Sequence, residues 1–108
     1  MPSTMPIRND GFKLTAAALN DLREIARYTQ NKWGKNKRSV YLRALDERFN
    51  WLAQNPDLGL PRDDIKTGYL CYPEGKHIIF YRKNDDWIDV LGILHQSMDF
   101  KVTPLAST

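Results

Sequence analysis

The hydrophobic positions between Leu19 and Leu52 recur at the three- and four-residue spacing of amphipathic helices. The first apolar stripe consists of Leu19, Leu22, Ala26, Thr29 and Trp33, with Ile25 beside it. Thr15 stands at the N-cap of this helix, and Gly34 stands where a C-cap glycine is expected. The second stripe consists of Tyr41, Leu45, Phe49 and Leu52, and Asn55-Pro56 ends it. Because the connection is so short, the two helices are predicted to run antiparallel as a helical hairpin.

Outside the helices the pattern changes to runs rich in β-branched and aromatic residues, which are typical of strands. Residues 11–14 predict a short first strand, and residues 68–72 predict a strand that Pro73 and a turn at Glu74-Gly75 close. Two longer runs flank Asn84-Asp85-Asp86 and predict a long β-hairpin. A two-residue turn at Asn84 and Asp85 gives this register: Tyr81 opposite Ile88, Ile79 opposite Val90, and His77 opposite Gly92.

In this register both faces of the hairpin are apolar. One face carries Ile79, Tyr81, Ile88, Val90 and Leu94, and the other carries Ile78, Phe80, Trp87, Leu91 and Ile93. An antiparallel sheet with one solvated face normally alternates apolar and polar residues, so both faces need cover. We therefore predict an α+β fold of order β-α-α-β-β-β, in which an antiparallel helical hairpin packs on one face of a small antiparallel sheet. The second face is then expected to expose an apolar patch of the kind that marks an interaction site.

Length and composition fit one domain with a single core, at 108 residues with 42% hydrophobic and 27% charged residues. We expect an N-terminal arm over residues 1–10, the domain over residues 11–100 and a C-terminal tail over residues 101–108. No apolar run approaches the ~18 residues of a membrane helix, and the first ten residues lack the apolar core of a signal peptide. The single cysteine, Cys71, cannot form an intrachain disulfide. A cytoplasmic location is therefore expected.

The net charge is only +3, but the cations are concentrated in one segment. No acidic residue occurs between Ile25 and Leu45, a segment that contains Arg27, Lys32, Lys35, Lys37, Arg38 and Arg43. This patch would attract an acidic protein segment or a nucleic-acid backbone. A solvated tip of the helical hairpin is an equally weighted interpretation.

Candidate chemistry is sparse in the sequence. His77 and His95 are the only histidines and do not lie in a ligand-spaced cluster, so neither a metal site nor a cofactor is predicted. No nucleophile–base signature surrounds Cys71 or a serine, and there is no glycine-rich phosphate loop. Two histidines could carry ribonuclease chemistry, but in the register above their rings point to opposite faces of the hairpin. A one-residue change of register would bring them together, so this pair remains a less favoured alternative.

A series of short motifs runs through almost the whole chain. The first half contains Ala18-x-x-Asp21-Leu22-x-x-Ile25-x-x-Tyr28-Thr29, Trp33-Gly34 and Tyr41. The second half contains Asn55-Pro56-x-x-Gly59, Gly68-Tyr69, Gly75-x-His77-x-Ile79-x-Tyr81 and Ile93-Leu94-His95-x-x-Met98-Asp99. From Phe12 to Leu105 this series, in order and with compatible gaps, resembles the ParE toxins of bacterial toxin–antitoxin pairs.

The resemblance implies the RelE/ParE fold and a toxin without catalytic activity that blocks DNA gyrase, stabilises gyrase-cleaved DNA and stops replication. It also implies a ParD-type antitoxin that wraps the toxin with its C-terminal segment and binds operator DNA with its N-terminal domain, so that toxin and antitoxin form a hetero-oligomer. The RelE branch cleaves messenger RNA at the ribosome with the help of cationic strand residues. Related toxins often carry arginines where this chain has Leu70 and Gly92. That difference weighs against the nuclease and leaves open whether the toxin is attenuated.

The resemblance and the apolar pattern together give the expected contact residues. For the antitoxin these are Tyr28, Trp33, Tyr41, Phe80, Trp87, Leu91 and Ile93. For gyrase they are His95, Met98 and Asp99. The alternative functions are a RelE-like ribosome-dependent endoribonuclease and a non-toxic co-repressor that only binds the antitoxin.

Overall fold

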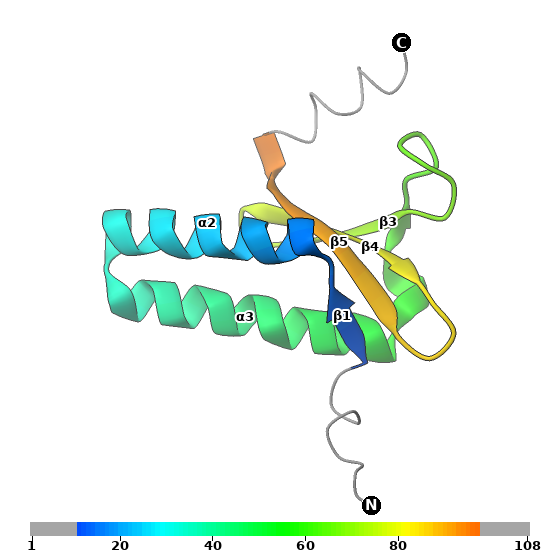
Figure 1. The fold of residues 1–108 in the computed structure, drawn as a ribbon, viewed down its shortest axis with the longest axis horizontal. Helices are drawn as coiled ribbons and strands as arrows, with labels where there is room; N and C mark the ends of the chain where they lie inside the picture. The colour runs from blue at the N-terminus through cyan, green and yellow to red at the C-terminus, as the bar shows by residue number, and fades with distance from the viewer. Residues whose placement is uncertain (1–10, 98–108) are drawn as a thin grey trace, which may run out of the picture.

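The structure, a computed structural model, describes residues 11–97 and contains a helical hairpin packed on a sheet (Figure 1). The helices are α2 (Ala16–Trp33) and α3 (Lys35–Gln54). The strands are β1 (Phe12–Leu14), β2 (Leu60–Pro61), β3 (Leu70–Glu74), β4 (His77–Lys83) and β5 (Ile88–His95). Within the described range they form one sheet in the order β1-β5-β4-β3-β2. The predicted β-α-α-β-β-β arrangement is confirmed. However, the sheet is mixed because β1 pairs parallel to β5, and the short strand β2 was not predicted.

Local capping sets the ends of the helices as the sequence predicts. The Thr15 hydroxyl oxygen accepts a hydrogen bond from the Ala18 amide at 3.1 Å, which caps α2. Gly34 separates the helices at φ 95°, a conformation that favours glycine, and its amide donates to the Gln30 carbonyl. Asn55 ends α3 directly before Pro56. None of the helices in residues 11–97 is long and apolar enough to cross a membrane.

The core lies between the helical hairpin and one face of the sheet. Its largest fully buried side chains are Tyr81, Phe49, Leu45, Leu52, Ile79, Ile88 and Val90. The Tyr81 hydroxyl donates a hydrogen bond to the Pro56 carbonyl at 2.9 Å. A β-carbon at Gly59 would lie 2.1 Å from the same hydroxyl oxygen. The backbone of the Asn55-Pro56-x-x-Gly59 motif thus lies against the buried Tyr81 and accepts its hydrogen bond.

The predicted register of the β-hairpin is wrong. Lys83 pairs with Ile88, so four residues form the turn instead of two, and Tyr81 pairs with Val90. The register then shifts between Phe80 and Tyr81, where Leu91 is the extra residue on β5. Beyond this bulge His77 pairs with His95.

The bulge also changes which side chains face the core. Ile93, predicted on the open face, is 3% exposed and belongs to the core. Leu94, predicted to face the helices, pairs instead with Ile78 and is absent from the buried core.

The prediction of a bare apolar patch on the second face is also wrong in part. Phe80 is buried, and Trp87 and Leu91 are half-buried. The Arg62 guanidinium lies 5.6 Å from the centre of the Phe80 ring, and Lys13 Nζ lies 4.0 Å from the Trp87 ring. Aliphatic stems that end in charges therefore cover part of this face, which sequence periodicity alone does not reveal. Leu60, which pairs with Cys71 beside Phe80, is exposed on this same face. The other exposed large apolar side chains of the described residues are Leu19, Tyr28, Trp33, Val40 and Leu58.

Candidate functional site

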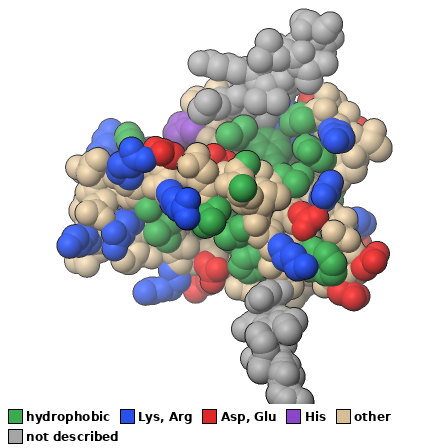
Figure 2. All heavy atoms as spheres, in the orientation of Figure 1, with side chains coloured by type: hydrophobic (Ala, Val, Ile, Leu, Met, Phe, Trp, Pro, Cys, Tyr) green, Lys and Arg blue, Asp and Glu red, His purple; other side chains and the backbone are tan. Residues whose placement is uncertain are grey.

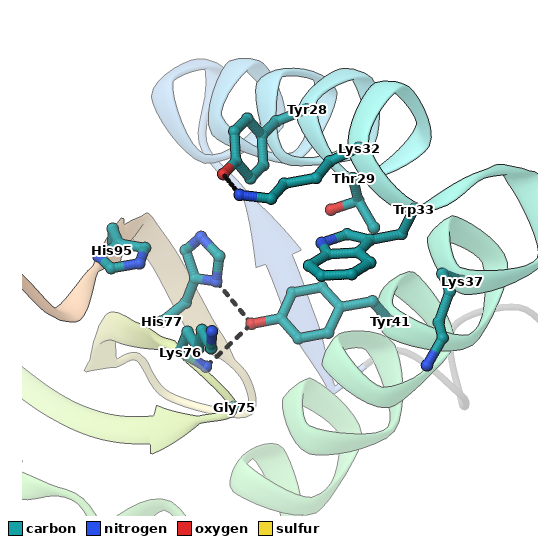
Figure 3. Close-up of a pocket in the computed structure, with 10 residues that line it drawn as sticks. All are labelled: Tyr28, Thr29, Lys32, Trp33, Lys37, Tyr41, Gly75, Lys76, His77 and His95. Atoms are coloured by element: carbon teal, nitrogen blue, oxygen red, sulfur yellow. Dashed lines mark hydrogen bonds between the residues drawn. The ribbon is translucent and has the colours of Figure 1, made fainter.

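A cavity of about 360 Å³ opens between the helical hairpin and the turn that joins β3 to β4 (Figure 3). Side chains from α2, α3, this turn and the end of β5 surround it. Its lining residues are Tyr28, Thr29, Lys32, Trp33, Lys37, Tyr41, Gly75, Lys76, His77 and His95. The cavity has the size of a small-molecule or side-chain binding pocket. We call it the tip pocket because it lies near the connection between the helices.

The floor of the tip pocket is held in place by hydrogen bonds around Tyr41. Its hydroxyl oxygen lies 2.5 Å from His77 Nδ1 and accepts a hydrogen bond from the Lys76 amide at 3.3 Å. The same hydroxyl reaches the Glu74 carbonyl at 3.2 Å. Burial raises the pKa of Tyr41, so this hydroxyl keeps its proton at neutral pH.

The turn that carries this floor depends on Gly75. Gly75 has φ 59°, and a β-carbon there would lie 2.8 Å from the Tyr41 ring. Only glycine meets both conditions without strain. The turn therefore holds Tyr41 and His77 in a fixed arrangement.

His77 and His95 meet across the two strands of the hairpin. Their ring centres are 5.4 Å apart and their planes are nearly perpendicular, at 80°. The prediction that these rings point to opposite faces is therefore wrong, because the bulge at Leu91 reverses the outer part of β5. Burial of the ring, and after it the nearby His95, lowers the pKa of His77 from 6.5 to about 4. The His77 ring is thus neutral at pH 7, and one of its nitrogens can accept a hydrogen bond.

The mouth of the tip pocket is aromatic and basic. Tyr28 and Trp33 are 61% and 58% exposed. Lys32 Nζ lies 5.6 Å from the centre of each ring and donates a hydrogen bond to the Tyr28 hydroxyl at 3.3 Å. Lysines are the charged residues of the lining, and none of the lining residues is acidic. Figure 2 shows lysine and arginine side chains gathered at this end of the helical hairpin.

The structure brings some of the expected contact residues together and separates others. Tyr28, Trp33, Tyr41 and His95 share the tip pocket. Trp87 and Leu91 lie away from it, on the far side of the sheet, together with the buried Phe80. Ile93 lies in the core and is closed to a partner. Met98 and Asp99 lie outside the described residues.

The sequence did not identify six members of the pocket as contact residues: Thr29, Lys32, Lys37, Gly75, Lys76 and His77. The only local signal was Glu74-Gly75, which predicts a turn; that this turn lies against the Tyr41 ring is seen only in the structure. The long-range pairing that places His77 next to His95 left no local signal.

The two positions where related toxins carry arginine do not form a cationic site. Leu70 is half-buried and packs against the core. At Gly92 a β-carbon would lie 3.3 Å from the Asp21 carboxylate, which already accepts the Ile93 amide at 2.9 Å. Among residues 11–97, no three histidine, cysteine or acidic residues lie close enough to hold a metal ion.

A family model, two related proteins and a solved structure all match this chain. The family model described as "ParE toxin of type II toxin-antitoxin system, parDE" matches residues 12–100. Toxin ParE1 of Mycobacterium tuberculosis is 38% identical over 89 residues, and Toxin ParE1 of Caulobacter vibrioides is 31% identical over 88 residues. Each match covers 82% of this chain and 91% of the relative. A solved structure described as the chromosomal ParDE TA system from P. aeruginosa has a TM-score of 0.67, covering 81% of this chain and 96% of that chain. At 20% identity, this match is a likeness of fold.

Proposed function

The chain belongs to the ParE toxin family of type II toxin–antitoxin systems, and on this premise we propose that it inhibits DNA gyrase and is neutralised by a ParD-type antitoxin. The family match over residues 12–100 carries this proposal. The tip pocket supports it, because exposed aromatic side chains beside unpaired cations suit a protein partner. No catalytic activity is needed for this function.

The tip pocket is the proposed centre of antitoxin contact. Tyrosine and tryptophan are enriched among the residues that dominate protein interfaces, and here Tyr28 and Trp33 project from α2 above the fixed Tyr41. The lysines around them would pair with acidic side chains of the antitoxin. Trp87 and Leu91 form a secondary candidate surface on the other side of the sheet, whereas Phe80 and Ile93 are too buried to contribute.

The proposed gyrase contact begins at His95 and continues into Met98 and Asp99. His95 lies at the exposed end of β5, so a partner can reach it without opening the core. Changing Met98 and Asp99 to alanine is expected to abolish growth arrest while antitoxin binding persists. Adding His95→Ala, at a residue that also lines the tip pocket, should weaken antitoxin binding as well. Lys66→Ala, a change at an exposed lysine in the loop between β2 and β3, serves as the control.

The decisive experiment uses purified chain with gyrase and relaxed plasmid. We expect less supercoiled product and more linear DNA after protein removal, and we expect a cognate ParD-type antitoxin to reverse both effects. In cells, induction of the chain alone should arrest growth and cause filamentation. Unaffected gyrase, or induction without growth arrest, would contradict the proposal and favour the co-repressor.

One observation favours a second candidate function, an endoribonuclease of the RelE kind. The close pair of His77 and His95 places two imidazoles side by side, the residue type that most often carries proton transfer. The lowered pKa of His77, about 4, makes this ring a weak base at pH 7. Leu70 and Gly92 weigh against it, because cations to stabilise the phosphate transition state are missing at these positions. Mapping messenger cuts on translating ribosomes separates the functions, since a gyrase inhibitor leaves RNA intact.

A further inference from the structure

The cations of the tip pocket have no carboxylate beside them. Several basic side chains outside the pocket do pair with carboxylates: Arg48 with Glu74 at 2.8 Å, Arg82 with Asp89 at 3.1 Å, and Lys83 with Asp57 at 2.5 Å. At the pocket, the Lys32 ammonium instead contacts two aromatic rings and a tyrosine hydroxyl. Its positive charge is therefore not neutralised by the protein. An anionic ligand would neutralise this charge.

The same pocket is built from flat rings. Half of its ten lining residues carry one: Tyr28, Trp33, Tyr41, His77 and His95. Tyr41 and His77 are fixed to each other by a hydrogen bond and form a rigid floor. Figure 3 shows Tyr28 and Trp33 extending from α2 beside the cavity, with Lys32 between them. This arrangement offers a planar ligand ring faces on more than one side.

A track of positive charge continues from the pocket along the connection between the helices. Lys35 and Lys37 are exposed at the start of α3, and Arg38 donates to the neutral side chain of Gln30. The first turn of α3 contains no acidic residue. A chain of phosphates crossing this end of the hairpin would therefore meet cations in succession.

We propose that the tip pocket binds one unpaired nucleotide of a single-stranded nucleic acid, with its base stacked on Tyr28 or Trp33 and its phosphate held by Lys32 and Lys76. Aromatic platforms beside a positively charged path are the usual means of holding single strands, because every base has a ring face to stack. The ring faces on several sides favour a planar base in the chain that is free of antitoxin, and the antitoxin proposed above would cover the same pocket. This inference does not depend on gyrase inhibition.

The test is fluorescence anisotropy with the full-length chain and a labelled thymidine oligonucleotide. Three competitors separate the sources of binding: free thymidine monophosphate, an abasic strand with the same number of phosphates, and a poly-glutamate peptide. We expect the oligonucleotide to bind at low salt, with an affinity that falls as salt rises. The abasic strand should compete at least ten times more weakly, and the free nucleotide should displace the label at higher concentration.

Point variants test whether the oligonucleotide binds at the tip pocket. Trp33→Leu is expected to weaken oligonucleotide binding about tenfold while leaving the abasic strand unchanged, because only the stacking surface is lost. Lys32→Gln should weaken both strands, whereas the matched change Lys66→Gln, at an exposed lysine of a distant loop, should weaken neither. Thermal unfolding followed by circular dichroism checks that each variant folds.

Three results would overturn the proposal. Equal affinity for the abasic and complete strands would show that the chain binds by general charge attraction and not by stacking a base. Displacement by poly-glutamate but not by the free nucleotide would make the pocket a peptide site. An oligonucleotide affinity that Trp33→Leu leaves intact, in a variant that still folds, would remove the pocket from the binding surface.

Discussion

At the scale of single residues, the motif glycines are explained by the side chains that lie against them. Gly59 has φ −71°, a conformation open to any residue, so its role is spatial and not conformational. It leaves room for the fully buried Tyr81, whose hydroxyl reaches the Pro56 carbonyl. Gly75 makes the same kind of room for Tyr41 in the tip pocket. In each of these two motifs, the glycine therefore makes room for a tyrosine that is distant in the sequence.

Gly59→Ala is expected to destabilise the fold by about 1–3 kcal/mol, because its β-carbon would overlap the Tyr81 hydroxyl. Tyr81→Phe alone should cost about 1 kcal/mol through the lost hydrogen bond. In the Tyr81→Phe background the cost of Gly59→Ala should be smaller, since the closest atom has gone. Urea unfolding of the four proteins measures this coupling. Additive costs would contradict the contact.

His77 gives the stability a defined pH dependence. Its folded-state pKa of about 4 lies below the 6.5 of an exposed histidine, so folding favours the neutral ring. As pH falls from about 6.5 towards 4, the unfolded chain gains a proton that the folded chain does not, and stability is lost over that window. Because the ring is only half-buried, we expect a loss of roughly 1–2 kcal/mol.

His77→Gln tests this expectation because glutamine does not titrate. Urea unfolding at about pH 7.5 and about pH 4.5 should show a smaller loss of stability in the variant than in the unmodified chain. The carboxylates are the same in both proteins, so their contribution cancels. Parallel pH profiles would show that the fold does not hold His77 in its neutral form.

At the scale of elements, the sequence predicts those features that local interactions decide. Thr15, Gly34 and Asn55-Pro56 mark the helix ends correctly because capping involves neighbours within four residues. The predicted hairpin register was wrong because the register depends on hydrogen bonds between residues more than 70 positions apart. At the bulge, the Thr15 hydroxyl reaches the carbonyls of Val90 and Leu91, and the Asp21 carboxylate accepts the Ile93 amide. Side chains of α2 thus satisfy backbone groups of β5 beyond its pairing with the short β1.

Asp21→Ala should therefore destabilise the fold by about 1–3 kcal/mol, since a half-buried backbone amide loses its acceptor. Asp21→Asn should cost less, because its side-chain oxygen can still accept. Hydrogen exchange of the Ile93 amide should accelerate more than that of Ile79 in the core. The exposed turn residue Asp86 supplies the control, and a comparable cost for Asp86→Ala would refute a specific role for Asp21.

At the scale of the whole molecule, the charge distribution and the fold combine into one surface. The short connection at Gly34 places the basic segment, with six cations between Ile25 and Leu45, at the same end as the β3–β4 turn and the last residues of β5. The sequence predicted the basic segment and the aromatic stripe separately. Their meeting with His77 and His95 in one cavity required the bulge, so half of the candidate site could be predicted from the sequence.

The lysines and the aromatic side chains of the tip pocket are predicted to have different kinetic effects on antitoxin binding. Lys32→Gln together with Lys76→Gln should lower the association rate constant about three- to tenfold at low salt, with a smaller change in the dissociation rate, because exposed charges act mainly by steering. Trp33→Ala should instead raise the dissociation rate, because buried aromatic anchors hold a formed complex. Stopped-flow association and surface-based dissociation with a cognate ParD-type antitoxin measure the two constants. A variant with Arg23→Gln and Lys66→Gln, at two exposed residues outside the tip pocket, removes the same two charges and controls for net charge. If the lysine pair changed only dissociation, its ammonium groups would belong inside the antitoxin interface and not at its edge.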